Sequence, residues 1–339
     1  MVNNFVLLIS ALTLLASAAS GQTIGPEVST PTDVKPGSIT CEECPYPYPS
    51  SYLPLNLYGE DVRIAYMDVA PEGQPNGHTV VLLHGNNFAG FYFGVVIDAL
   101  RREGFRVIVP DQIGYGRSSK PIIPYDLTDM ARNTRTILKS LNIDKAMIVG
   151  HSMGGMLAAR FATQYPEIVE RLVLLNPIGL TDTRFSRPLG DPEEAYKRTL
   201  ASTYQTIRAS LMRYVAHKPS AWNENFETYA RIRYAWTLSA DWPRLARVQT
   251  LINNVIYLDP VVYDWAHIQA TTLVYGGAED MLSGSPAAFQ EGMKRIAVTI
   301  PNGKARLQLL PGLGHVPFIE DPAQSLPPLV SFLKEGVKR

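Results

Sequence analysis

The chain has little of several features that would assign a protein to a class at once. Lysine plus arginine and aspartate plus glutamate both number 31, so neither sign of charge is in excess. This balance indicates no electrostatic partner such as nucleic acid or an anionic membrane surface. The sequence has no internal repeats, and its one long apolar stretch lies near the N-terminus. We therefore expect a globular protein with no membrane span in its mature form.

The apolar stretch near the N-terminus has the pattern of a secretory signal. It runs from Phe5 to Ala16, and small residues follow around Ala18 and Ser20. The stretch is shorter than the roughly 20 residues that span a bilayer. No lysine or arginine precedes it, so the usual positive charge comes from the chain's own amino group alone. We predict a signal peptide over residues 1–20, and a secreted or periplasmic protein.

Cysteine is nearly absent, which limits metal and redox chemistry. The only two cysteines are Cys41 and Cys44. A zinc site would need two more suitably spaced ligands, and none stands nearby. A redox-active pair should open a helix, whereas Pro45, Pro47 and Pro49 follow this one. In an oxidising compartment the pair is expected to form a local disulfide, and we expect no metal site.

The rest of the chain divides by pattern. Residues 21–54 are rich in Pro, Ser, Thr and Gly, which is typical of an extended N-terminal arm. Short apolar runs then alternate with helix-like segments, a pattern of parallel strands with crossover helices. The expected strands are 63–69, 79–83, 105–109, 146–149, 172–175, 271–275 and 306–310, and the expected core helices are 93–102, 127–141 and 322–334. Residues 179–265 lack strand character and are interpreted as a helical cap, with helices over 193–216, 225–237 and 245–257. The cap separates a first core segment, 55–178, from a second, 266–339.

The most informative motif is Gly150-His151-Ser152-Met153-Gly154. It follows an apolar strand and precedes a helix, as in a nucleophile elbow. Glycines two residues before and after the serine let the neighbouring segments pass closely. The motif therefore predicts Ser152 as a nucleophile.

A serine nucleophile needs a histidine base and an acid that orients it. Of the three later histidines, His217 and His267 occupy ordinary structural positions. His315 lies in a glycine-bounded loop after a strand, where an open α/β sheet presents its site. The acid should close the strand between Ser152 and His315, and Asp280 is preferred over its neighbour Glu279 because of its spacing from Gly277.

The negative oxygen of the transition state needs donors that are already aimed at it. One is the backbone amide of Met153, at the start of the helix after the nucleophile. The second is expected from the amide of Asn86, in the loop after strand 79–83, with the Asn87 side chain as an alternative. His84 is interpreted as a residue that braces this loop.

Together these motifs resemble the α/β-hydrolase superfamily over about residues 55 to 335. The motifs that carry the resemblance are His84-Gly85-Asn86-Asn87, Asp111 to Ser118, the elbow, Gly277 to Asp280, and Gly314-His315. The resemblance implies an eight-stranded, mostly parallel sheet with a helical cap, and a triad of Ser152, Asp280 and His315. It also implies that Asp111 and Ser118 are structural.

Departures from particular relatives narrow the chemistry. Haloalkane dehalogenases and epoxide hydrolases of this fold have aspartate where Ser152 stands. Proline iminopeptidases carry a different glycine-rich loop after the first buried strand. Carbon–carbon bond hydrolases often have asparagine and tryptophan where His151 and Val316 stand. The range that remains is carboxylesterase, lactonase and thioesterase.

We therefore predict a carboxylic-ester hydrolase that works without a cofactor, through an acyl-enzyme on Ser152. The alternatives are acyl transfer to another acceptor, including hydrogen peroxide, carbon–carbon bond hydrolysis on the same triad, and a hydrolase-fold protein that binds a ligand with little turnover. An aromatic-rich cap favours a fairly apolar substrate. The residues expected to contact it are Asn87, Trp222, Phe226, Tyr229 and Trp236.

Overall fold

A computed structural model describes residues 28–337 of the chain. The expected signal peptide, residues 1–20, and the first residues of the expected arm lie outside this range. Among the helices of residues 28–337, none combines the length and the apolar character needed to cross a membrane.

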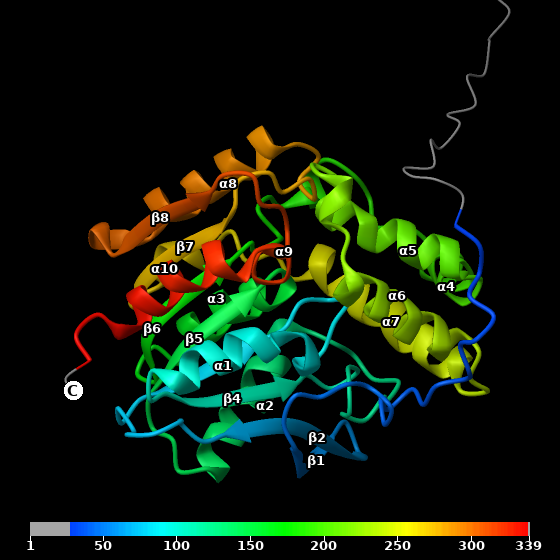
Figure 1. Cartoon of the computed structure of the whole chain (residues 1–339), viewed down its shortest axis with the longest axis horizontal. Helices are drawn as coiled ribbons and strands as arrows, with labels where there is room; N and C mark the ends of the chain where they lie inside the picture. Colours follow the sequence, from blue (N-terminus) through cyan, green and yellow to red (C-terminus); the bar gives the residue numbers. More distant parts are fainter. Residues whose placement is uncertain (1–27, 338–339) are drawn as a thin grey trace, which may run out of the picture.

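The core is one eight-stranded sheet, as the sequence predicts (Figure 1). Its strand order is β1-β2-β4-β3-β5-β6-β7-β8. Only β2 runs against the other strands, because it pairs antiparallel with both β1 and β4 while the remaining pairs are parallel. The strands are β1 (Ser50–Leu57), β2 (Glu60–Val69), β3 (Thr79–Leu83), β4 (Arg106–Asp111), β5 (Ala146–His151), β6 (Val169–Leu175), β7 (Thr271–Gly277) and β8 (Ala305–Leu310).

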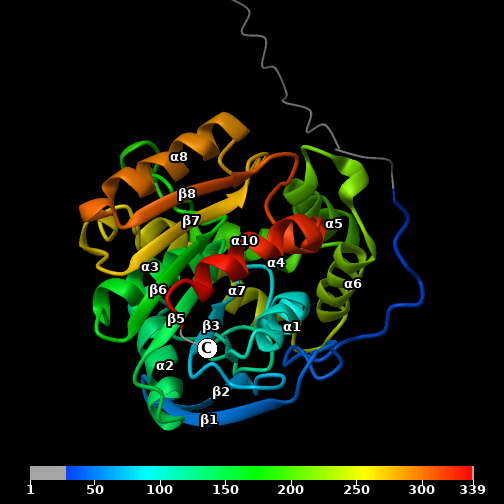
Figure 2. The same ribbon diagram turned by 60° about the vertical axis from the view of Figure 1, so that its left-hand side comes forward.

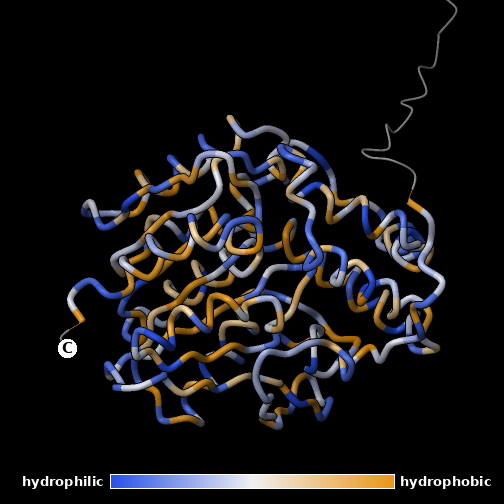
Figure 3. Tube along the Cα trace, viewed as in Figure 1, coloured by the Kyte–Doolittle hydropathy of each residue, from blue (hydrophilic) through white to orange (hydrophobic). Residues whose placement is uncertain are grey.

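Helices cover both faces of the sheet, which explains the continuous apolar runs of its central strands. Within β3, Val80 and Leu82 face one layer, while Val81 and Leu83 face the other. The first layer holds α1 (Gly94–Arg102) and α10 (Pro322–Lys334). The second holds α2 (Leu127–Ser140), α3 (Met153–Gln164) and α8 (Pro286–Thr299). Hydrophobic stretches accordingly follow the central strands, and hydrophilic ones mark the outer turns (Figure 3).

The cap lies between β6 and β7 and covers the carboxyl ends of the strands (Figures 1 and 2). Its helices are α4 (Pro192–Leu200), α5 (Tyr204–Met212), α6 (Glu224–Thr237) and α7 (Trp242–Leu258). Helix α4 packs on α7, and α5 packs on α6. The single helix expected over 193–216 is wrong. Thr203 and Thr206 cap a new helix at this point. The Thr203 hydroxyl accepts a hydrogen bond from the Thr206 amide, and the Thr206 hydroxyl accepts one from the Thr203 amide.

Several shorter elements lie between these helices and strands. They are α9 (Pro317–Glu320) and the 3₁₀ turns Gly90–Phe93, Thr183–Phe185, Arg213–Val215, Pro219–Ala221, Trp265–His267 and Pro301–Gly303. Strand β1 and helices α8 and α9 are the elements not predicted above. Because β1 begins at Ser50, the N-terminal arm ends at Pro49 rather than at Pro54.

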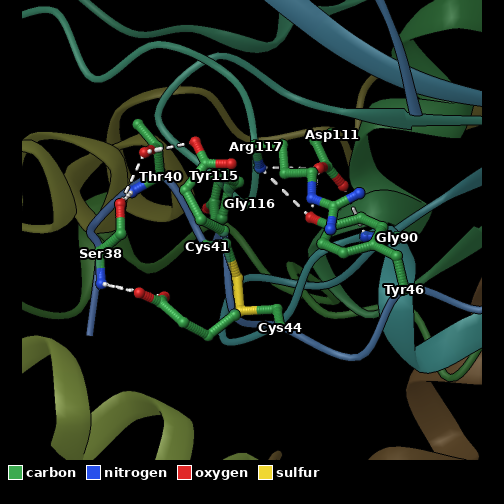
Figure 4. Close-up of a disulfide and its surroundings, with 12 residues drawn as sticks. Ser38, Thr40, Cys41, Cys44, Tyr46, Gly90, Asp111, Tyr115, Gly116 and Arg117 are labelled. Carbon is green, nitrogen blue, oxygen red and sulfur yellow. Dashed lines mark hydrogen bonds between the residues drawn. A yellow bond between two sulfur atoms is a disulfide. The ribbon is translucent and has the colours of Figure 1, made fainter. Parts of the chain in front are cut away.

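The arm, residues 28–49, runs along the outside of the cap before it reaches the core (Figures 1 and 2). Its Gly37 amide donates to the Ala235 carbonyl of α6 at 2.9 Å, and Asp33 pairs with Arg231 of the same helix. Nearer the core, the Tyr46 hydroxyl donates to Asp111 (Figure 4). Cys41 and Cys44 form a disulfide between these two attachments. The arm therefore connects the cap to the core.

Candidate active site

Ser152 occupies a sharp turn between β5 and α3. Its backbone has φ 58° and ψ −122°, a conformation that side-chain-bearing residues rarely adopt. The flanking glycines are required by close backbone contacts. A Cβ at Gly150 would lie 2.0 Å from the Gly154 carbonyl oxygen, and a Cβ at Gly154 would lie 2.1 Å from the Leu83 carbonyl oxygen. These contacts bring α3 against β3 and hold the serine hydroxyl above the carboxyl edge of the sheet.

The structure brings Ser152, His315 and Asp280 together from three separate segments. The Ser152 Oγ lies 2.9 Å from His315 Nε2, and His315 Nδ1 lies 2.6 Å from Asp280 Oδ2. The carboxylate can only accept a hydrogen bond, so Nδ1 carries the proton and Nε2 is free to take one from the serine. Both His315 and Asp280 are buried. The neighbouring Glu279 makes no contact of this kind.

The Asp280 carboxylate is held by more than the histidine. The Leu282 amide donates to Oδ1 at 2.8 Å, and the Asn176 side-chain amide donates to Oδ2 at 2.9 Å. Burial opposes ionisation of Asp280, but the charge of His315 and these hydrogen bonds outweigh it and lower the pKa of the carboxyl. No role for Asn176 was predicted from the sequence. Its position directly after a buried strand, at the edge that carries the site, was the available signal.

Two backbone amides near Ser152 are candidates for an oxyanion site. Within residues 28–337, neither the Asn86 nor the Met153 amide donates to a protein acceptor. The loop carrying Asn86 passes close to the nucleophile, since a Cβ at Gly85 would lie 2.9 Å from the Ser152 Cβ. The Asn86 side chain is engaged elsewhere, between the Tyr115 hydroxyl and Asn253 of α7.

The side chain of Asn87 is engaged as well, because it donates to the Tyr214 hydroxyl of the cap. His84 braces the loop from the other side. Its Nε2 accepts from the Gln112 amide at 3.1 Å, so its Nδ1 donates to the Gly85 carbonyl at 2.9 Å. The backbone amides of Asn86 and Met153 are therefore the available donors at this position.

His151 and Tyr92 join the oxyanion loop to the segment of the base. The Tyr92 hydroxyl accepts from the Gly85 amide at 3.0 Å and donates to His151 Nδ1 at 2.8 Å. His151 Nε2 then donates to the His315 carbonyl at 2.8 Å. Burial lowers the pKa of His151 to about 3, helped by the nearby His315. The ring is therefore neutral at physiological pH, which this chain of hydrogen bonds requires.

The backbone around His315 is held from two further sides. The Glu320 carboxylate accepts from the amides of Gly314 and Val316, at 2.9 and 3.2 Å. Burial raises the pKa of Glu320. The Tyr214 carbonyl accepts from the His315 amide at 3.1 Å, and its ring packs 4.8 Å from the imidazole. Tyr214 belongs to the cap, so the cap contributes directly to the position of the histidine.

A cleft of about 560 Å³ reaches Ser152 beneath the cap. Asn87 and Tyr214 lie at its inner end beside the serine, and Ile178, Leu180 and Ile256 contribute apolar surface. Three exposed arginines lie along its outer part, namely Arg187, Arg213 and Arg295. No acidic side chain lines the cleft within the described part of the chain.

The expected aromatic contacts of the cap are largely wrong. Trp222, Phe226 and Tyr229 do not line the cleft. Phe226 is fully buried and stacks on Trp222 with ring centroids 5.5 Å apart, while Tyr229 packs against Phe88 at the same centroid distance. The rings bury more apolar surface against one another than a cleft wall would allow. Trp236 lines a separate small chamber behind Asn86.

The described residues contain no group of three or more histidine, cysteine, aspartate or glutamate side chains that could hold a metal ion. Asp111 accepts hydrogen bonds from the amides of Gly90 and Arg117 and from Tyr46 of the arm (Figure 4). Ser118 donates to the Asp111 carbonyl at 2.6 Å. Both residues therefore hold loops in place.

The chain belongs to the alpha/beta hydrolase family, whose family model matches residues 80–326. It is similar to a solved structure described as a probable hydrolytic enzyme from Pseudomonas aeruginosa PAO1. The two share 33% identity with a TM-score of 0.81, over 90% of this chain and 99% of that one. A solved meta-cleavage product hydrolase, 24% identical with a TM-score of 0.64, covers 84% of this chain and 98% of its own, and shows the same fold.

Curated relatives match over shorter segments. An uncharacterized protein of Mycobacterium tuberculosis is 38% identical over 107 residues, which is 31% of each chain. A putative carbamate hydrolase of Serratia proteamaculans is 30% identical over 208 residues, 61% of this chain and 65% of the relative. The chain thus spans about a third of the length of the first relatives and under two thirds of the second. Relatives named for an activity include hydrolases with different bond preferences.

Proposed function

We propose that the protein is a serine hydrolase that cleaves carboxylic esters, including lactones and thioesters, through an acyl-enzyme on Ser152. The observation that carries the proposal is the hydrogen-bonded series Ser152, His315, Asp280 at the inner end of a cleft. The two unpaired amides beside the serine support it, because they suit the oxyanion of acyl transfer. The substrate is a small molecule, and the residues require no cofactor for this chemistry.

The reaction follows from the positions of these groups. His315 Nε2 takes the Ser152 proton as Oγ attacks the carbonyl carbon, and the amides of Asn86 and Met153 donate to the resulting oxyanion. The carbon–oxygen bond to the alcohol breaks as Nε2 returns the proton to the leaving oxygen. Water then attacks the acyl carbon, with Nε2 again as base, and Oγ leaves with its proton restored. Asp280 stabilises the imidazolium in both halves.

The test combines turnover with covalent labelling. Wild-type protein should release a chromogenic alcohol from a short-chain aryl ester with an initial burst, and an organophosphonate should label Ser152. Ser152→Ala should abolish labelling and lower kcat by at least about 10⁴-fold. Ser331→Ala, an exposed serine of α10, is the control and should keep full activity.

The rival functions give different results in the same assay. If the protein transfers acyl groups, release of the chromogenic alcohol should accelerate when alcohols, amines or hydrogen peroxide are added as acceptors. No turnover of esters, lactones or thioesters, with the serine unlabelled, would overturn the proposal in favour of a ligand-binding role. Turnover of carbamates or of carbon–carbon substrates alone would reassign the bond that is cleaved.

We also propose that the protein is exported through the segment at residues 1–20. The sequence of that segment supports export, and the disulfide between Cys41 and Cys44 suits an oxidising compartment. N-terminal sequencing of protein recovered outside the cytoplasm tests this proposal.

A further inference from the structure

A small, partly enclosed chamber lies beside the oxyanion loop, next to the large cleft. Its volume is about 40 Å³, enough for a few waters or one carboxylate-sized group. Its walls come from the oxyanion loop, the loop after β4, helices α6 and α7 of the cap, and Ile39 of the arm. No acidic side chain lines it within residues 28–337.

Arg233 of α6 lines this chamber, and one nitrogen of its guanidinium has no partner within residues 28–337. The side chain is half-buried, its Nη1 is shielded from solvent, and no hydrogen-bond partner for that atom lies among the described residues. Burial lowers the pKa of Arg233, and only the hydroxyls of Tyr214 and Tyr115 act against this. A guanidinium keeps its charge under such conditions. A shielded cation without a counter-charge is costly, so the arrangement favours an anionic guest.

The other cation of the chamber is not available in the same way. Lys120 donates to the carbonyls of Tyr115, Gly116 and Ser118, so all three of its ammonium hydrogens have partners. Its burial lowers its pKa to about 7. Lys120 therefore organises the loop, and Arg233 is the group with donors to offer.

The chamber adjoins the cleft that contains Ser152. Asn86 and Asn87 line both the chamber and the cleft that contains Ser152. The Tyr115 hydroxyl, on the chamber side, donates to Asn86 Oδ1 at 2.6 Å and lies 3.6 Å from the sulfur of Met153. Asn86 and Asn87 are therefore the residues that separate Ser152 from the chamber that contains Arg233.

We propose that this chamber binds a carboxylate carried by the substrate, so that the preferred esters are half-esters of short dicarboxylic acids whose free carboxylate pairs with Arg233. The inference rests on the proposed ester hydrolysis and specifies its substrate class. Arginine suits this role because its planar fork donates two parallel hydrogen bonds to one carboxylate. The three arginines of the outer cleft are exposed to solvent and would bind the same group more weakly.

The experiment compares two matched esters by the methanol they release. One is a monomethyl ester of glutarate or adipate, and the other has its free carboxylate replaced by the isosteric, neutral amide. Wild-type protein should show a kcat/KM at least about 10-fold higher for the acid than for the amide. In Arg233→Gln this ratio should fall by about 10- to 100-fold, the effect of a lost charge-assisted pair. Arg233→Lys keeps the charge without the fork and should give an intermediate ratio.

Two further variants separate Arg233 from other cations. Arg198→Gln removes an exposed arginine of α4, outside both cavities, and should leave the ratio and the activity unchanged. Arg213→Gln removes a cation of the large cleft. A ratio near one in wild-type protein, or a ratio lost in Arg213→Gln and kept in Arg233→Gln, would overturn the inference. If the acid half-ester, the neutral amide and simple aryl esters all fail to turn over, the proposed hydrolase function is itself overturned, and the inference falls with it.

Discussion

His151 shows how one buried side chain can make the stability of the protein depend on pH. Its pKa is lowered to about 3 in the native protein, mainly by burial, whereas an unfolded histidine has a pKa near 6.5. Between these values the unfolded chain binds a proton that the native one does not. With respect to this group, the native state therefore keeps its full stability above about pH 6.5. As the pH falls from there toward 3, the free energy of unfolding decreases by up to about 1.4 kcal/mol per pH unit.

We predict that His151→Gln reduces this slope. The free energy of unfolding, measured in urea between pH 7 and pH 4.5, should fall less steeply with acidification than in wild-type protein, by about 1 kcal/mol per pH unit. Ile148→Val is the matched control, because it removes one methyl from the core of β5 and no titrating group. If both variants show the same slope, His151 is not the group responsible.

At the scale of elements, the elbow depends on how closely β3, β5 and α3 approach. Gly154→Ala would place a Cβ 2.1 Å from the Leu83 carbonyl oxygen, so α3 must move away from β3. We predict a loss of stability of about 3 kcal/mol and the loss of the ester burst in the fraction that still folds. Urea unfolding and burst amplitude measure the two effects.

Gly190→Ala is the control for this change, because nothing lies within 4 Å of a Cβ at Gly190. Its stability should stay within about 0.5 kcal/mol of the wild-type value. An active, stable Gly154→Ala protein would contradict the close approach of α3 to β3.

The central strands were predictable because they are buried on both faces and appear as continuous apolar runs. Strand β1 was not, since it is an edge strand whose residues are mostly exposed or half-buried, and it contains Pro54. Helix α8 was missed although Phe289, Met293 and Ile296 lie at helical spacing, because Gly292, which packs against Leu180, interrupts this apolar face. The break between α4 and α5 near Thr203 was not predicted, because it depends on local capping and leaves no trace in the spacing of apolar residues.

The candidate site shows the same division between local and distant information. Ser152, Asp280 and His315 each lie in a short motif, so their assembly could be predicted residue by residue. The contact between Tyr92 and His151 joins residues 59 positions apart and has no local pattern. The cap aromatics were misplaced because helical spacing is the same for rings that pack together and for rings that face a cleft.

At the scale of the whole molecule, the arm fixes the cap to the core. Residues 28–38 contact α5 and α6 through Gln205, Arg231 and Ala235. We predict that replacing residues 28–38 with a glycine–serine sequence of equal length lowers hydrogen-exchange protection in α6 by about 10-fold, because local opening then breaks fewer contacts. Amides of β5, in the centre of the sheet, serve as the internal reference and should exchange as before. Equal protection of α6 in both proteins would show that the arm does not hold the cap.

The attachment of the arm also has a consequence for the order in which the chain acquires its structure. Asp33 and its partner Arg231 are separated by 198 positions, and synthesis proceeds from the N-terminus. Residues 28–38 are thus made first among the described residues, yet the surface of α6 that they contact is made only much later. Docking of residues 28–38 can only follow the synthesis of α6, whereas the attachment of Tyr46 to Asp111 can form earlier.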